Sequence, residues 1–250
     1  MLLMRRMTGS LKIASVAGFA FSLLSPSTIL SPWTRNDVHG WLGPWRLCVL
    51  AAYGDAPHMF AFALIPFAIL ALDSALRSLR AGRWFLAAIL LASISTTNWL
   101  GTLALACMVF AYLLATTAKL ADLSRWGWSA LIALTGYAMA SPWIPPSTIA
   151  LVRANGQLAD GDYRSDMEAF PQRALILGII YIIVKIWLHR RKTLPAIQFA
   201  AFAMILPGGI PLLGEWGKVA LFPIPHRYHW ELDFAVIFLV SLAVARLFRN

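Results

Sequence analysis

Long apolar runs separated by short charged gaps are the feature that most constrains the fold of this chain. Hydrophobic residues make up 60% of its 250 residues and charged residues only 13%, whereas soluble domains carry about 45–50% apolar and about 25% charged residues. A soluble protein of this size has no core large enough for so many apolar side chains. The surplus is expected to face lipid, and the same composition excludes a disordered chain.

The runs predict an all-α fold, a polytopic transmembrane helix bundle of about eight membrane segments forming a single domain over residues 1–250. A spanning helix needs about 20 apolar residues. A basic flank precedes the first run, but no small-x-small cleavage site follows it, which favours an uncleaved first span over a cleaved signal peptide. The expected spans are 11–30, 57–76, 84–97, 99–118, 127–146, 172–188, 194–213 and 231–248.

The stretch from Trp84 to Ala118 predicts a short hairpin. A continuous helix over its roughly 35 residues would be about 52 Å long, too long for one crossing and short for two. Asn98 and Gly101 interrupt the run, so we expect the break there, with Asn98 below the membrane surface at the floor of a cavity.

The distribution of charge predicts that both termini are cytoplasmic, because short cytoplasmic loops collect Lys and Arg. With the hairpin, two thirds of the 21 Lys and Arg lie inside. Every acid except Asp73 and Asp122, and every histidine except His189, lies outside. The net charge of +10 is thus a topology signal, and nucleic acid is not an expected partner. The inside cations are Arg5, Arg6, Lys12, Arg77, Arg80, Arg83, Lys119, Arg125, Lys185, Arg190, Arg191, Lys192, Arg246 and Arg249.

The first outer loop combines tryptophans with one acid. Trp33, Trp41 and Trp45 suit an aromatic belt at the membrane interface; stacking on a sugar or lipid is the alternative. Asp37 lies between them, and the Leu42–Tyr53 segment is expected to lie along the interface as a short amphipathic helix.

Gly54–His58 opens the second span. Asp55 precedes Pro57 where an N-cap carboxylate would bind free backbone N–H groups, so capping alone can explain it. His58 lies one turn into an apolar helix, and ionisable groups at that depth usually face a bundle interior or a water-filled cavity. A structural and a functional role both stay open for these two residues.

The last outer loop, 223–233, is the densest polar cluster. Arg227 and Glu231, like His229 and Asp233, are spaced i, i+4 and are expected to pair on one helix. The alternative is that Arg227 and the helix N-terminus hold a phosphate while Glu231 or a histidine handles protons. The spacing of His226 and His229 is weak evidence for metal.

Two further patterns give little evidence for a binding site. The loop from Asp160 to Glu168 has a calcium-like composition but lacks the spacing of an EF-hand, so a solvated loop is expected. Cys48 and Cys107 are isolated thiols that indicate neither a disulfide framework nor a metal site.

Three segments, Tyr53–His58, Thr97–Gly101 and Arg227–Asp233, resemble those of a group of bacterial polytopic membrane proteins related to 6-pyruvoyl-tetrahydropterin synthase. Their architecture is similar to that of GT-C glycosyltransferases, which take sugars from polyprenyl-phosphate donors at the outer face. The resemblance covers about residues 20–245 and implies a multi-pass protein of the bacterial plasma (inner) membrane. Such enzymes are much longer and carry an acidic pair in the first outer loop that Asp37 lacks. The chain therefore resembles the C-terminal part of one, as a fragment or a short relative.

The resemblance implies a site on the outer face. Arg227 and Lys218 would hold the donor phosphate, and Asp37 or Asp55 would activate the acceptor hydroxyl. The catalytic candidates are Asp37, Asp55, His58 and Glu231, and the substrate-binding candidates are Asn98, Lys218, Arg227, His229 and Asp233.

The expected partners are membrane lipids, a lipid-linked sugar and other membrane subunits. No cofactor is specified by the sequence, and a divalent metal stays open. The alternative functions are a non-catalytic module for lipid binding, flipping or transport, and an assembly subunit without a ligand. A transporter is expected to carry ionisable residues at the middle of a span and an internal repeat. The sequence shows neither feature.

Overall fold

The computed structural model describes residues 1–78, 80–117, 123–156, 170–218 and 224–247, and within these ranges the chain forms helices and no strands. The predicted all-α fold is confirmed. The helices are α1 (Leu2–Thr8), α2 (Leu11–Leu23), α3 (Ser27–Leu30), α4 (Pro32–Asp37), α5 (Trp45–Cys48), α6 (Ala56–Ser78), α7 (Ala81–Thr97), α8 (Trp99–Thr116), α9 (Leu123–Ala140), α10 (Pro146–Gly156), α11 (Phe170–Arg190), α12 (Pro195–Ile205), α13 (Gly209–Trp216) and α14 (His229–Leu247), with a π-helical turn at Val49–Tyr53 and a 3-10 turn at Pro225–Tyr228.

Three helical segments among the described residues are long and apolar enough to cross a membrane. They are α6 with 23 residues, α8 with 18, and the 22-residue segment Pro195–Trp216, which contains α12 and α13. Pro66 lies inside α6 without ending it, as membrane helices tolerate. The predicted membrane character is confirmed at this level.

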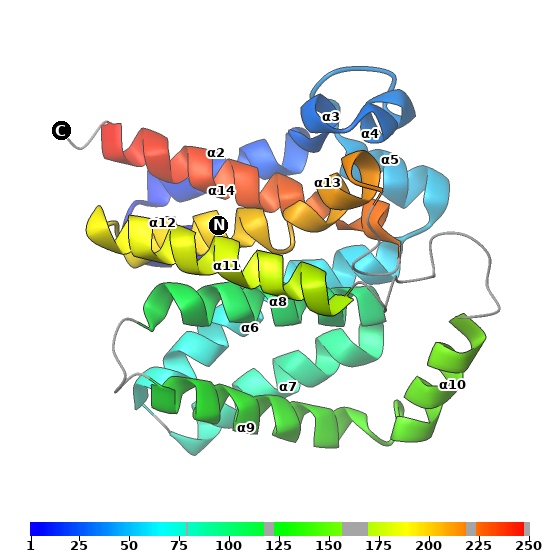
Figure 1. Ribbon diagram of the computed structural model, residues 1–250, viewed down its shortest axis with the longest axis vertical. Coiled ribbons are helices and arrows are strands. Elements are labelled where there is room, and N and C mark those ends of the chain that lie inside the picture. The colour runs from blue at the N-terminus through cyan, green and yellow to red at the C-terminus, as the bar shows by residue number, and fades with distance from the viewer. Residues whose placement is uncertain (79, 118–122, 157–169, 219–223, 248–250) are drawn as a thin grey trace.

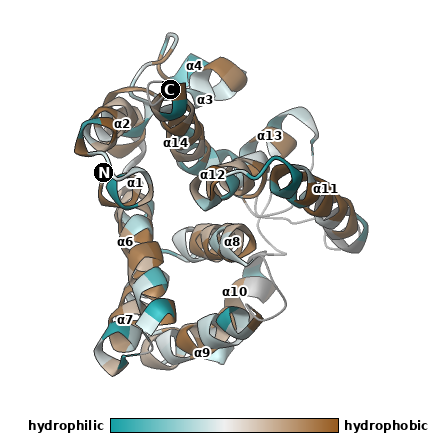
Figure 2. Ribbon diagram, turned by 90° about the vertical axis from the view of Figure 1, so that its left-hand side faces the viewer, coloured by the Kyte–Doolittle hydropathy of each residue, from teal (hydrophilic) through white to brown (hydrophobic). Residues whose placement is uncertain are grey.

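The long helices run roughly side by side, and the short helices α3, α4 and α5 lie together at one end of the bundle (Figure 1). Viewed from the side in Figure 2, α8 lies inside an arc formed by α6, α7 and α9 on one side and by α12 and α14 on the other. The position of α8 agrees with its many buried residues, which run from Leu100 to Ala115. The core of the molecule therefore lies around α8.

The predicted hairpin is confirmed. Helix α7 ends at Thr97 and α8 begins at Trp99, and between them Asn98 is extended. The Asn98 side-chain oxygen accepts a hydrogen bond from Gly101 N at 3.1 Å, which satisfies a backbone donor of the first turn of α8. A polar amide therefore ends one helix and caps the next.

Glycine permits the closest helix packing. A Cβ atom added to Gly101 would lie 2.5 Å from the Cβ of Ala61 in α6, and one added to Gly136 in α9 would lie 3.0 Å from the carbonyl oxygen of Ala88 in α7. Small residues let membrane helices approach closely and gain dispersion contacts. These two contacts fix α8 and α9 against the α6–α7 pair.

The expected first span was wrong in length. The helix in 11–30 stops at Leu23, and the chain continues through Pro26 into the separate helix α3. Proline disfavours helical geometry in the residue before it, and α3 is bound at its own start, because Asp233 Oδ1 accepts a hydrogen bond from Ser27 N at 2.7 Å. The chain therefore folds over the end of the bundle earlier than its hydropathy indicates.

Candidate active site at one end of the bundle

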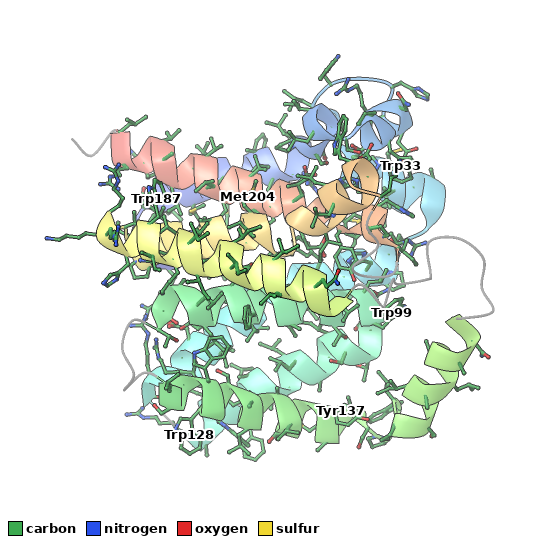
Figure 3. All side chains as sticks on the ribbon, viewed as in Figure 1. Trp33, Trp99, Trp128, Tyr137, Trp187 and Met204 are labelled. Carbon is green, nitrogen blue, oxygen red and sulfur yellow. The ribbon has the colours of Figure 1, made fainter. Side chains whose placement is uncertain are left out.

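Six of the nine predicted site residues lie where α6 and α14 begin: Asp55, His58, Arg227, His229, Glu231 and Asp233. The 3-10 turn Pro225–Tyr228 leads directly into α14, and α3 to α5 fold over the same end (Figure 1). Figure 3 shows Trp33, from α4, at this end of the molecule and Trp187, from α11, at the opposite end. Residues far apart in sequence are thus brought together at the starts of α6 and α14, with the short helices α3 to α5 folded over them.

Four side chains form what we call the charged chain: Arg227, Asp55, His58 and Glu231. Arg227 Nη1 donates to Asp55 Oδ1 at 3.3 Å, and Asp55 Oδ2 lies 3.8 Å from His58 Nδ1. His58 Nε2 lies 3.1 Å from Glu231 Oε1, within hydrogen-bond distance. The chain runs from a partly exposed cation, 38% exposed at Arg227, to a fully buried carboxylate at Glu231.

Asp55 lies at the boundary between solvent and the helix bundle. Burial alone would raise the pKa of its carboxyl, but the nearby His58 ring and the positive charges of Arg227 and His226 outweigh this effect, so the pKa lies below its usual range. Asp55 is therefore an ionised hydrogen-bond acceptor at neutral pH. The hydrogen bond from Arg227 orients one of its two carboxylate oxygens, and the other faces the His58 ring.

A second ion pair lies beside the charged chain and is buried. Arg46 Nη1 donates to Asp233 Oδ2 at 3.1 Å, with side-chain exposures of 6% and 0%. Arg46 Nη2 donates to the carbonyl oxygen of Leu24, and its guanidinium stacks 4.0 Å from the centre of the Phe21 ring. Burial lowers the pKa of Arg46, an effect that Asp233 counters. This pair ties α5 and the end of α2 to α14.

An aromatic cluster lies next to both ion pairs. The His229 ring stacks on Trp33 at 6.3 Å and meets Trp45 edge-on at 5.5 Å, and Trp230 lies 4.7 Å from His58. Trp45 is 2% exposed, so the belt predicted for all three tryptophans is wrong for this one. Trp33 and Trp41 are exposed, as an interfacial position requires.

The pairing predicted within the last outer loop was wrong. Arg227 lies in the 3-10 turn before α14 and bonds to Asp55, whereas Glu231 bonds to His58. The partner of Asp233 is Arg46, and neither ring nitrogen of His229 has a hydrogen-bond partner within the described residues. The i, i+4 rule does not apply to Arg227 and Glu231, because Arg227 lies in the 3-10 turn and not in α14.

The remaining predicted residues lie outside the charged chain. Asp37 Oδ2 accepts a hydrogen bond from Trp45 Nε1 at 3.0 Å, which makes Asp37 a support for the aromatic cluster. The Asn98 oxygen is used to cap α8. Lys218 is exposed after the end of α13, and no described hydrogen bond or ion pair joins it to the cluster.

Arg46 is the functional candidate that sequence reasoning missed. It lies in the Leu42–Tyr53 segment, expected as an amphipathic helix and observed as α5 followed by a π-helical turn. Its buried face carries Trp45, Arg46 and Val49, so the cation points inward. An arginine within an otherwise apolar segment is the signal that could have found it, because such residues usually face a partner or a cavity.

Several buried polar atoms at the start of α14 lack hydrogen-bond partners in the described part of the chain. They include Glu231 Oε2, His58 Nδ1, Trp230 Nε1 and both ring nitrogens of His229. Buried polar groups are nearly always hydrogen-bonded, so such a group of atoms marks a place for water or a polar ligand.

An apolar cavity of about 300 Å³ adjoins this place. Arg46 and Trp230 line it together with the aromatic side chains of Phe21, Phe62 and Phe234, from helices α2, α6 and α14. Such a lining suits a hydrocarbon chain.

Neither a metal nor a thiol site emerges at this end. In the described ranges, no three His, Cys, Asp or Glu side chains lie close enough to hold an ion. Cys48 and Cys107 are free thiols, and Cys107 is buried in α8. The loop from Asp160 to Glu168 lies outside the described residues.

Comparison of the chain with protein-family models, with curated proteins and with solved structures finds no match.

Proposed function

We propose that this chain is a GT-C-like membrane glycosyltransferase, or a fragment of one, that uses a polyprenyl-phosphate-linked sugar at the outer face of the membrane. The observation that supports this most is the charged chain, which joins a partly exposed arginine to an ionised, oriented carboxylate at the end of the bundle. Glycosyl transfer from a lipid phosphate needs these two groups side by side: a proton acceptor for the hydroxyl and a cation for the phosphate.

In the proposed reaction Asp55 accepts the proton of the acceptor hydroxyl as its oxygen bonds to the anomeric carbon of the sugar. The bond between that carbon and the phosphate oxygen breaks, and the polyprenyl phosphate leaves with the electron pair. Arg227 stabilises the charge of the leaving phosphate. His58, which lies between the two carboxylates, favours the ionised form of Asp55, and Glu231 positions the His58 ring.

The lipid part of the donor fits the apolar cavity. Its aromatic side chains include the buried Phe62 and the partly buried Phe21 and Phe234, and Arg46 and Trp230 line the same cavity beside the charged chain. A phosphate at the charged chain with its hydrocarbon in this cavity satisfies both halves of a lipid-linked sugar.

The proposed setting is the bacterial plasma membrane, crossed by eight segments with both termini cytoplasmic. The sorting of charge supports it, because Arg5, Arg6 and Arg77 lie at helix ends away from α3, α4 and the charged chain. Short cytoplasmic loops collect such cations. The resemblance of three loop segments to the GT-C-like membrane proteins supports the same setting.

The test uses cells that carry the gene. The gene is deleted and replaced by wild type, Asp55→Asn, Arg227→Ala or Asp37→Asn, and glycans and lipid-linked sugars are measured by mass spectrometry at matched protein levels. We expect Asp55→Asn to lower the glycan product by about 10²-fold or more, as loss of a general base does, while lipid-linked sugar accumulates. Asp37→Asn is the matched control and should keep at least half of the product.

Two results would contradict the proposal. Wild-type glycan levels in both Asp55→Asn and Arg227→Ala would remove the charged chain from any transfer reaction. A loss in Asp37→Asn with none in Asp55→Asn would place the base in the first outer loop.

The burial of ionisable residues at the site favours a second function, a non-catalytic module for lipid binding, flipping or transport. His58, Glu231 and Asp233 are fully buried, and buried ionisable groups in membrane proteins often mark ion or substrate pathways. This function predicts that Asp55→Asn alters the distribution of lipid between the two leaflets while the sugar on each lipid stays unchanged. The same mass spectra, taken with leaflet labelling, distinguish the two functions.

A further inference from the structure

A second cavity lies at the end of the bundle opposite the charged chain. It measures about 250 Å³ and is lined by residues of α1, α6 and α8 and of the start of α12. We call it the basic pocket. Its polar lining comes from Arg6, Asp73, Arg77, Tyr112 and Thr116, none of which takes part in the proposed glycosyl transfer.

Asp73 organises the two arginines of the basic pocket. Both of its carboxylate oxygens accept from Arg77 Nε, at 2.9 and 3.0 Å, and Oδ1 also accepts from the Tyr112 hydroxyl at 2.6 Å. Arg6 Nη2 lies 3.8 Å from Asp73 Oδ2, beyond hydrogen-bond distance. The carboxylate of Asp73 is thus fully used by these contacts. The outer parts of both guanidinium groups remain free to bind a ligand.

The donors that remain on these arginines are available to a ligand. Arg6 and Arg77 are each 57% exposed in the side chain, and within the described residues the two terminal amino groups of Arg77 make no hydrogen bond. Two cations face one carboxylate, so the pocket carries a net positive charge. Guanidinium groups arranged in this way bind phosphate through paired N–H donors.

The start of α12 adds to the same preference. Leu194, Pro195 and Ala196 line the pocket, and no side chain of the described residues caps this helix. The positive end of the helix dipole and an unbonded first-turn N–H group favour an anion there. The helix start is additional to the two arginines, which alone give the pocket its charge.

The rest of the lining is apolar and indicates where the apolar part of a phosphate-bearing ligand would lie. The buried Leu3 and Ile69 and the partly buried Leu70 also line the pocket, and the adjoining α6 and α8 are long and apolar enough to cross a membrane. A phosphate bound by the arginines would therefore have hydrocarbon-like surface directly beside it. We propose that the basic pocket binds the phosphate headgroup of an anionic phospholipid, with an acyl chain along Leu3 and Leu70.

The test measures lipid retention by the purified full chain. Native mass spectrometry from detergent compares phosphatidylglycerol with phosphatidylcholine of identical acyl chains, for wild type, Arg6→Ala and Arg5→Ala. Arg5 is the matched control, because it is an exposed neighbour on the same helix and does not line the pocket. We expect Arg6→Ala to bind phosphatidylglycerol about tenfold more weakly, as loss of one charge-assisted contact does, and Arg5→Ala to match wild type.

A competition arm identifies the source of the phosphate. Inorganic phosphate and glycerol 3-phosphate should fail to displace phosphatidylglycerol at millimolar concentration, because neither contacts the apolar side. Equal losses in Arg5→Ala and Arg6→Ala, equal retention of the two lipids, or displacement by inorganic phosphate would each overturn the proposal. Both variants keep every carboxylate of the charged chain, so this result is independent of the glycosyltransferase test.

Discussion

The candidate active site contains the buried ion pair of Arg46 and Asp233, whereas the basic pocket at the opposite end leaves its arginines in contact with solvent. Arg46 and Asp233 are 6% and 0% exposed in the side chain, but Arg6 and Arg77 are both 57% exposed. A buried charge is stable only with its partner, because desolvation without pairing is costly. An exposed arginine keeps its hydration and stays available to a ligand. Arg46 is therefore structural, whereas Arg6 and Arg77 are free to bind a ligand.

The largest expected effect concerns Arg46. Changing Arg46 to Ala leaves the fully buried Asp233 without its cation, and breaking a buried pair in this way costs about 3–5 kcal/mol. Denaturant unfolding in detergent micelles, followed by circular dichroism, measures the loss. The double variant Arg46→Met with Asp233→Leu should recover most of it, since no unpaired charge remains. Wild-type stability of the single variant would show that the pair is not buried in the folded protein.

An intermediate effect is expected on the pH dependence of stability, through the titration of Asp55. The folded-state pKa of this carboxyl is lowered by His58 and Arg227 despite burial, so its contribution to stability is present above the unfolded pKa of about 3.9 and is lost as pH falls through the folded value. Arg227→Ala should move this loss to higher pH and cost at most about 1 kcal/mol at pH 7, because Arg227 is partly exposed. Unfolding midpoints of wild type and Arg227→Ala between pH 3 and pH 7 check the shift. Superimposable profiles would disprove the interaction.

The smallest effect is expected at Arg6. Its contact with Asp73 is long, at 3.8 Å, and solvent-exposed, so Arg6→Ala should change the free energy of unfolding by less than about 0.5 kcal/mol. The same unfolding measurement, with lipid removed by detergent exchange, tests this. A cost similar to that of Arg46→Ala would erase the distinction between the two ends.

The helical architecture could be predicted because it follows from local pattern. Apolar runs set the positions of α6 and α8, and the break at Asn98 was visible as an amide followed by a glycine. The end of α2 at Leu23 could not be read in this way. It depends on Pro26 and on the cap that Asp233 provides from a distant helix.

The site could be predicted as a set of residues but not as a set of pairs. Asp55, His58, Arg227 and Glu231 were all identified from their position at the start of two helices. Their partners come from different helices, and the spacing rule applied to Arg227 and Glu231 holds only within one regular helix. Arg46 was missed for the same reason, since its partner lies 187 residues away in sequence.

The most direct test of the account asks whether the charged chain acts as one unit. Asp55→Asn, Glu231→Gln and the double variant are compared for glycan product in the gene-replaced cells at matched protein levels. Residues that work through one another are not additive, so the double variant should lose no more product than Asp55→Asn alone. Wild-type product from Asp55→Asn, or a double-variant loss equal to the product of two independent losses, would contradict the account.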